Sequence, residues 1–215
     1  MNFDFDAAIF DMDGTLLNTM PYWRYTSLEY LLAHQLPVRE DILLRMYATS
    51  SRRLLAEYMD ELGVPYERGE MIRELEGYMN RHYLYDAHLK VPSVPLLLDR
   101  LRSEGVRMCV ATGSPREYAR NGLKRLGLLD YFEFVTDNYE GSFTKDQPGY
   151  FDDVMVRLGA TPDRCWVFED ALYAMESAKA SGLRVCAIEE DTQLESREAI
   201  KALADVYVRD YRELL

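Results

Sequence analysis

The chain has 215 residues, of which 48% are hydrophobic and 29% are charged, and its formal net charge is −12. This hydrophobic share can bury a sizeable core, which excludes a disordered chain, and the acidic excess argues against a nucleic-acid polymer as partner, since phosphate backbones are bound through surplus Lys and Arg. No apolar run reaches about 18 residues and the N-terminus carries acids rather than the basic residues of a secretory signal, so we expect no membrane span and a cytoplasmic location.

Short apolar runs of β type alternate with helical patterns along most of the chain, which is typical of βαβ units and a parallel sheet. Strands are expected at residues 7–10, 107–111, 134–136, 165–168, 185–188 and 205–208. The predicted fold class is therefore α/β, with a parallel sheet as its centre.

Roughly ninety residues between the first two expected strands have helical periodicity and almost no strand signal. Helices are expected there at residues 23–34, 51–62 and 67–83. Such a length is too great for one crossover helix, so the sequence predicts an inserted α-helical unit. Turn signals at Pro21, Pro92 and Pro95 mark its ends.

The first chemically suggestive residues follow the first expected strand, in the sequence D-M-D-G-T at 11–15. Two acids at a strand end add nothing to strand stability, and the carboxyl ends of parallel strands are where open α/β sheets place ligands. A calcium loop would need a Glu where Tyr22 stands, and a dinucleotide site would need a glycine-rich turn where Gly14 is the only glycine. We therefore interpret Asp11 and Asp13 as residues of a functional site.

Polar residues also follow the second expected strand. Thr112, Gly113 and Ser114 offer hydroxyls and backbone N–H groups just before a helix expected to begin near Arg116, an arrangement suited to phosphate oxygens. Because Ser114 precedes Pro115, we interpret its side chain as a cap of that helix rather than as a ligand group.

Two further motifs carry charge. Lys145 lies shortly before a helix expected at 150–158, although a lone lysine is more often a solvated surface residue. Glu169 and Asp170 directly follow another expected strand and form a second acidic pair. Strand ends that carry acids, a hydroxyl and a cation are hard to explain by stability alone, so the sequence predicts one common site.

With these motifs in order, the chain resembles the haloacid dehalogenase superfamily, in the helical-cap branch that includes β-phosphoglucomutase and phosphoglycolate phosphatase. The resemblance covers essentially the whole chain and rests on residues 11–15, Thr112, Lys145, Glu169 and Asp170. It implies a Rossmann-like core at residues 1–18 and 91–215 with an α-helical cap at 19–90. It also implies a Mg²⁺-dependent phosphatase that hydrolyses a small phosphorylated metabolite through a phosphoaspartyl intermediate.

The resemblance gives each motif residue a chemical role. Asp11 would be the nucleophile, since a carboxylate can form an acyl phosphate and divide hydrolysis into two steps. Asp13 would protonate the leaving oxygen and then accept a proton from the attacking water, a second acid that favours phosphoryl transfer over dehalogenation. Thr112 and Gly113 would bind the phosphoryl group, and Lys145 would offset the charge of the crowded carboxylates and phosphate.

The same resemblance implies a metal site. Mg²⁺ prefers hard oxygen ligands and can bridge nucleophile and phosphate. The expected ligands are Asp11, Asp170 and the backbone carbonyl of Asp13, while Glu169 would orient a metal-bound water. Departures from the common family pattern remove none of these groups; they are Asn18, the K-D-Q-P sequence at 145–148, Ala171 and Ala174.

Substrate selection is expected in the inserted helices, where aromatic and basic residues are the candidates. They are Tyr22, Trp23, Tyr47, Ser51, Arg52 and Arg53. The alternative for the aromatic pair at 22–23 is packing within the insertion, and the alternative for the two arginines is a solvated face. The sequence indicates neither the substrate itself nor an oligomeric state.

Cysteine and histidine give no sign of a redox or zinc site. The cysteines form no C-x-x-C pair and lie in or beside apolar runs, so we expect reduced, buried thiols. The histidines lack the spacing of a metal site and are expected at the surface or at helix ends. These residues are Cys109, Cys165, Cys186, His34, His82 and His88.

Two alternative functions stay open. A sugar phosphomutase of the β-phosphoglucomutase type would have a histidine near the place where Trp23 stands, which favours hydrolysis, although Arg52 or Arg53 could clamp a distal phosphate. A non-catalytic binding protein on the same fold would be expected to lack Asp11 or Asp13, and both are present.

Overall fold

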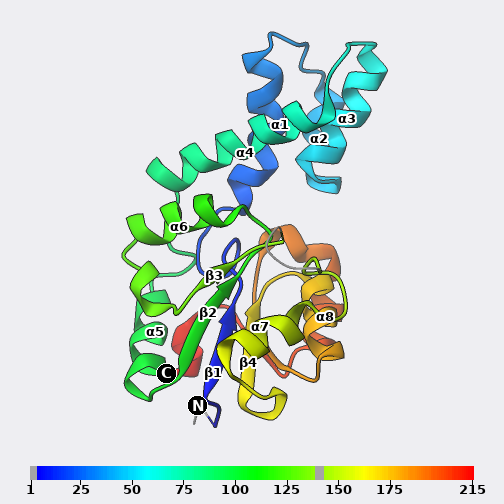
Figure 1. Cartoon of the computed structure of the whole chain (residues 1–215). Helices are drawn as coiled ribbons and strands as arrows, with labels where there is room; N and C mark the ends of the chain where they lie inside the picture. The colour runs from blue at the N-terminus through cyan, green and yellow to red at the C-terminus, as the bar shows by residue number, and fades with distance from the viewer. Residues whose placement is uncertain (1–3, 139–142) are drawn as a thin grey trace. The chain divides into compact units, whose positions relative to one another are not determined.

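The computed structural model describes residues 4–138 and 143–215, and the chain divides into two compact units (Figure 1). The first unit comprises Met1–Asn18 and His88–Leu215, and the second comprises Thr19–Ala87. The second unit is thus an insertion between two segments of the first.

The linking segments are paired within the first unit. Asn18 N donates a hydrogen bond to His88 O at 2.9 Å, and Lys90 N donates to Leu16 O at 2.8 Å. Residues 88–90 therefore belong to the first unit because they are hydrogen-bonded to the segment that follows its first strand.

The first unit is built on a parallel sheet with the strand order β3-β2-β1-β4-β5-β6. The strands are β1 Ala7–Phe10, β2 Arg107–Ala111, β3 Val135–Thr136, β4 Cys165–Glu169, β5 Arg184–Ile188 and β6 Val206–Val208. Because all the pairings are parallel, the carboxyl ends of the strands meet at one edge of the sheet. The predicted α/β class with a parallel sheet is confirmed.

Helices cover both faces of this sheet, with α5 and α6 on one side and α7 and α8 on the other (Figure 1). The helices of this unit are α5 Val94–Ser103, α6 Arg116–Arg125, α7 Tyr150–Leu158, α8 Leu172–Ala180 and α9 Arg197–Leu203. Coverage on both sides explains why the strands are continuous apolar runs. Ile9 and Phe10 point to opposite faces and are both fully buried, each burial stabilising the fold by ~1.5–3 kcal/mol.

The cysteines lie in the central strands. Cys109, Cys165 and Cys186 are free thiols and all three are buried, as predicted. Burial raises the pKa of each thiol, that of Cys165 to about 12. Thiols held in the neutral form are poor nucleophiles, which agrees with a packing role.

The second unit consists of helices packed around their own apolar core. They are α1 Met20–Ala33, α2 Glu40–Ala48, α3 Ser51–Leu62 and α4 Arg68–Tyr85. Leu31, Leu55 and Leu75 come from three of these helices and are fully buried in one cluster. Helix α3 begins where Ser50 accepts a hydrogen bond from Arg53 N and ends at Gly63 with a φ of 64°, both common helix boundaries.

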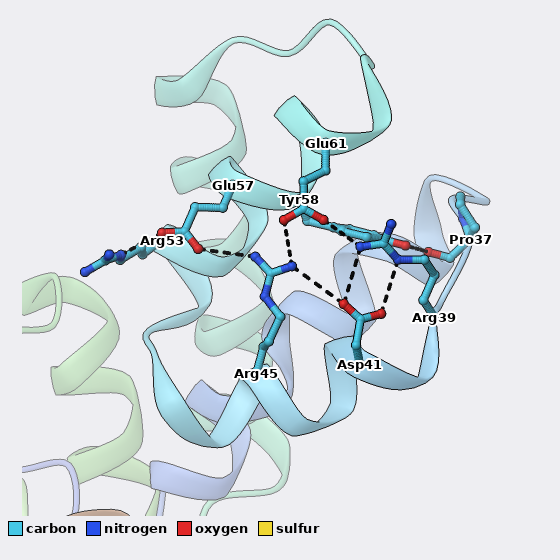
Figure 2. Close-up of polar contacts among 8 residues, drawn as sticks. All are labelled: Pro37, Arg39, Asp41, Arg45, Arg53, Glu57, Tyr58 and Glu61. Atoms are coloured by element: carbon cyan, nitrogen blue, oxygen red, sulfur yellow. Dashed lines mark hydrogen bonds and ion pairs between the residues drawn. The ribbon is translucent and has the colours of Figure 1, made fainter.

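Ion pairs join α2 to α3 on the surface of the second unit (Figure 2). Arg45 lies 3.2 Å from Glu57 and 2.8 Å from Glu61, and Arg39 lies 2.5 Å from Glu61. Solvent screens surface pairs of this kind and they contribute little to stability, so apolar packing is the main stabilising contribution in this unit. Across the described residues, the structure contains no helix whose length and apolar character would allow it to span a membrane.

Candidate active site

The acidic motif after β1 is shaped by a tight turn. Leu17 N donates a hydrogen bond to Met12 O at 2.9 Å, and Gly14 has a φ of 89°. Glycine adopts this left-handed conformation without the steric cost that a side chain would cause. The turn leaves Asp11 buried at the end of the strand, whereas Asp13 is partly exposed.

Three carboxylates form a buried cluster at the carboxyl ends of β1 and β4. One oxygen each of Asp11, Glu169 and Asp170 lies within 4.8 Å of the others. Glu169 Oε1 accepts hydrogen bonds of 3.1 Å from the N–H groups of Asp170 and Ala171, which fix its orientation. Thr15 Oγ1 donates to Asp170 Oδ1 at 3.4 Å.

Lys145 lies against this cluster. Its Nζ is 2.5 Å from Asp11 Oδ1 and 2.7 Å from Glu169 Oε2, and its side chain is 2% exposed. Its backbone N–H donates to Asn138 Oδ1 at 2.9 Å, which ties the loop that carries Lys145 to the end of β3. The alternative of a solvated surface lysine is therefore wrong, because the ammonium group is buried between two carboxylates.

The negative charge of the cluster exceeds the positive charge of Lys145. Burial, followed by the charge of Glu169, raises the pKa of Asp11 to about 7, although Lys145 opposes this. Burial and Glu169 also raise the pKa of Asp170 well above its usual range. Burial lowers the pKa of Lys145, but Asp11 and Glu169 outweigh it and the pKa is raised well above that of a free lysine. Additional positive charge would therefore stabilise the ionised carboxylates.

The donor set fits a divalent cation. Asp11 Oδ1 contacts Lys145, whereas Asp11 Oδ2 is buried and accepts no hydrogen bond from any residue that the structure describes. Leaving a buried carboxylate oxygen without a partner is costly, and a metal ligand bond would satisfy it. Carboxylate oxygens are the ligands that hard cations such as Mg²⁺ prefer.

We expect Asp170→Asn to raise the melting temperature of the metal-free protein and to remove the stabilisation by Mg²⁺. The amide relieves repulsion among the buried acids but is a poorer ligand. When the Mg²⁺ concentration is 100 times its Kd, the free energy of unfolding of wild type is expected to rise by about 2.7 kcal/mol. This corresponds to a rise of ~5–10 °C in its melting temperature. Thermal denaturation in EDTA and in Mg²⁺ measures both effects. Asp152 is exposed, so Asp152→Asn is the control for the loss of one negative charge alone. If Mg²⁺ stabilised all three proteins equally, Asp170 would not be a metal ligand.

The expected cap of helix α6 is wrong. The residue before the helix is Pro115 and no side chain caps it there. Instead, Asp137 Oδ2 accepts a hydrogen bond of 2.7 Å from Arg116 N, the first residue of the helix. A carboxylate from the end of β3 thus satisfies the donor that Ser114 was expected to satisfy.

Ser114 points into the candidate site. Its Oγ donates to Asp13 Oδ2 at 2.6 Å, and its backbone N–H donates to Thr112 Oγ1 at 3.1 Å. Thr112 is fully buried at the end of β2. A Cβ at Gly113 would lie 3.6 Å from Asn138 Nδ2, so this segment passes close to the residue that holds the Lys145 loop.

Within the second unit, Trp23 and Arg52 lie together. The Arg52 guanidinium is 5.8 Å from the centroid of the Trp23 ring, and its Nη2 is 2.7 Å from Glu76 Oε1. Trp23 Nε1 donates to the Tyr83 hydroxyl at 3.2 Å, while Ser51 Oγ donates to Trp23 O at 2.6 Å. These contacts join α1, α3 and α4.

The remaining substrate candidates are dispersed within the second unit. Arg53 is 74% exposed, and its Nε lies 2.8 Å from Glu57 Oε1 (Figure 2). Tyr22 stacks on His82 with 4.4 Å between ring centroids. The side chain of Tyr47 lies outside the described residues. Both arginine candidates are thus paired with carboxylates of their own unit.

Residue patterns alone gave no role to Thr15 or Asn138, and they predicted a helix cap rather than a contact within the site for the Ser114 hydroxyl. Asn138 is the second residue after the end of β3, so the rule that ligands gather at strand ends could have identified it. Thr15 and Ser114 carry no comparable signal, because their partners are distant in the sequence.

The sequence is similar to known hydrolases over most of its length. The family model for haloacid dehalogenase-like hydrolases matches residues 8–188. A phosphorylated carbohydrates phosphatase of Thermotoga maritima is 28% identical over 184 residues, which is 83% of this chain and 82% of the relative. A fructose-1-phosphate phosphatase of Escherichia coli is 30% identical over 179 residues, which is 82% of this chain and 93% of the relative.

The fold has a close counterpart among solved structures. CbbY from Rhodobacter sphaeroides in complex with phosphate matches with a TM-score of 0.80 and 21% identity, over 98% of this chain and 96% of that chain. At this level of identity, the similarity to CbbY shows only that the fold is shared. The family model, in contrast, matches most of the sequence. The chain belongs to the haloacid dehalogenase-like hydrolase family.

Proposed function

We propose that this chain is a cytoplasmic, Mg²⁺-dependent phosphatase that hydrolyses a small phosphorylated metabolite through a phosphoaspartyl intermediate. The observation that carries the proposal is the buried Asp11 carboxylate. One of its oxygens contacts Lys145, and the other has no hydrogen-bond partner among the described residues, in a cluster with Glu169 and Asp170. Relatives that align over most of the chain are named as phosphatases of phosphorylated sugars, which supports this substrate class.

The residues that would hold Mg²⁺ are Asp11, Asp170 and the backbone carbonyl of Asp13, and Glu169 would orient a water at the same site. Bound Mg²⁺ supplies positive charge that offsets the charge of the phosphoryl group and of the clustered carboxylates. Glu169 suits a supporting role because Lys145 and two backbone N–H groups already hold its carboxylate.

The remaining steps are assigned to residues of the chain. Asp11 attacks phosphorus while Asp13 gives a proton to the leaving oxygen, which releases an alcohol and leaves a phosphoaspartate. Asp13 then takes a proton from the attacking water, and phosphate leaves Asp11. The Thr112 hydroxyl and the backbone N–H of Gly113 hold the phosphoryl oxygens, and Lys145 holds Asp11 in its ionised form.

The second unit is proposed to act as a cap that selects the substrate, with Trp23, Arg52 and Arg53 as contact residues. The pairing of Arg52 with Glu76 and of Arg53 with Glu57 supports a monophosphate substrate. A clamp for the second phosphate of a bisphosphate would need cations whose charge is not already balanced. Hydrolysis is therefore favoured over the transfer of phosphate within a sugar.

A panel of phosphorylated metabolites tests this function. We expect release of inorganic phosphate that requires Mg²⁺, stops in EDTA and is absent from Asp11→Asn protein purified in the same way. Hexose 1-phosphates are included with and without a hexose bisphosphate primer. Primer-dependent isomerisation that outpaces phosphate release would establish a mutase instead, and full activity in excess chelator would refute the metal requirement.

A further inference from the structure

Ser114 connects two groups that the proposed mechanism treats separately. Its Oγ lies 2.6 Å from Asp13 Oδ2, and its backbone N–H donates to Thr112 Oγ1 at 3.1 Å. Ser114 is 3% exposed, so water does not compete strongly for these hydrogen bonds. The residue thus joins the end of β2 to the motif that follows β1.

The direction of each hydrogen bond follows from the number of hydrogens available. A hydroxyl group has one hydrogen and can accept through its lone pairs. An ionised carboxylate only accepts, so the Ser114 hydroxyl hydrogen is committed to Asp13. Thr112 Oγ1 accepts from the Ser114 backbone, which directs its own hydroxyl hydrogen away from Ser114 and makes it available to a phosphoryl oxygen.

We propose that Ser114 is a positioning residue of the phosphatase reaction, which orients the Asp13 carboxyl group for proton transfer and the Thr112 hydroxyl for phosphoryl binding. This inference rests on the proposed function. Because Oδ2 of Asp13 accepts from Ser114, the proton of the acid form is favoured on Oδ1. Without the Ser114 hydroxyl, the Asp13 carboxyl group would rotate over a broad range of its terminal torsion angle, and either of its oxygens would face the leaving group.

The proton-transfer steps balance as follows. In the first step the P–O bond of the ester breaks, a bond forms between phosphorus and Asp11, and Asp13 Oδ1–H protonates the leaving oxygen to give an alcohol. In the second step water attacks phosphorus, its proton goes to Asp13, and the bond between phosphorus and Asp11 breaks. Ser114 keeps its proton throughout and acts only through its neighbours.

The inference predicts that the loss in Ser114→Ala depends on the leaving group. An alkoxide needs a proton as it leaves, whereas 4-nitrophenolate is a stable anion that leaves without one. The value of kcat/KM reports the steps up to the first release of product. For the alkyl phosphate that wild type hydrolyses fastest, kcat/KM is expected to fall about ten-fold, which is the size of effect expected when a hydrogen bond to a charged group is lost. For 4-nitrophenyl phosphate, kcat/KM is expected to change little.

Ser93→Ala is the matched control. Ser93 Oγ donates to Asp210 Oδ1 at the same distance of 2.6 Å, in the same unit, and Ser93 is 1% exposed. Losing this bond is expected to lower the melting temperature about as much as Ser114→Ala does, and to leave both kcat/KM values unchanged. A purely structural role of Ser114 would give the same result as this control.

Asp13→Asn completes the test. If Ser114 acts through Asp13, adding Ser114→Ala to Asp13→Asn should cause almost no further loss of kcat/KM on the alkyl phosphate. Equal losses on the alkyl and aryl phosphates, or a full ten-fold loss in the Asp13→Asn background, would overturn the inference. If Asp13→Asn alone hydrolyses the alkyl phosphate at the wild-type rate, the proposed function of Asp13 fails, which is a distinguishable result.

Discussion

Replacement of Asp11 by asparagine is expected to reduce phosphate release by about 10⁴-fold or more, the order of loss that follows removal of a nucleophile. An amide cannot form the acyl phosphate. The substitution keeps the shape of the side chain, and its amide oxygen can still accept the hydrogen bond of Lys145, which is 2.5 Å in the native site. The loss is measured from initial rates of phosphate release, with a substrate identified in the panel of phosphorylated metabolites.

The same variant is expected to be no less stable than wild type when metal is chelated. Burial raises the pKa of Asp11 to about 7, with Glu169 adding to the effect. An acid whose pKa is raised by folding costs stability as the pH rises from its unfolded pKa, ~4, toward its folded pKa, ~7. Asparagine removes this cost, so the melting temperature of Asp11→Asn in EDTA should exceed that of wild type more at about pH 8 than at about pH 5.

These two measurements separate a catalytic role from a structural one. Loss of turnover in a protein that melts at or above the wild-type temperature identifies Asp11 as a reacting group. Turnover close to that of wild type would refute the nucleophile, and a large drop in melting temperature at about pH 8 would contradict the electrostatic description of the cluster.

The sheet could be predicted from the sequence because its strands are buried on both faces. Residues 7–10 and 107–111 were predicted with the bounds that β1 and β2 have, since each is a short, mostly apolar run that ends just before a polar residue. Helix α5, at Val94–Ser103, was not named. Its Pro95 was interpreted only as a turn signal, although proline is equally common in the first turn of a helix, where it stands here.

The site was predictable only where a local rule applied. Asp11, Glu169 and Asp170 were found because acids that follow the predicted parallel strands all lie at the same edge of the sheet, where the carboxyl ends of the strands meet. The burial of Lys145 depends instead on packing between distant segments, and no periodicity in its own loop indicates it. Ser114 shows the same limit: beside a proline and a helix it resembles a cap, but its hydroxyl bonds to a carboxylate 101 positions away.

Lys145→Met is expected to destabilise the fold by about 3–5 kcal/mol and to lower the melting temperature by ~6–20 °C. Methionine has a similar volume, so the loss comes from charge rather than from a cavity. The Lys145 ammonium contacts Asp11 and Glu169, whose side chains are 8% and 1% exposed. Removing it leaves buried carboxylates without their cation, and turnover should also fall. Thermal denaturation in EDTA measures the effect without added metal.

A second substitution distinguishes this explanation from general damage to the core. If uncompensated charge is the cause, adding Glu169→Gln to Lys145→Met should restore part of the lost stability, because replacing both partners of a buried pair is far less costly than replacing one. Lys90→Met is the matched control, since Lys90 forms an ion pair with Glu190 in the same unit, with side chains 11% and 4% exposed. It is expected to lower the melting temperature without removing activity. A double variant that is less stable than Lys145→Met would show that Lys145 stabilises the fold by packing rather than by balancing the charge of the nucleophile.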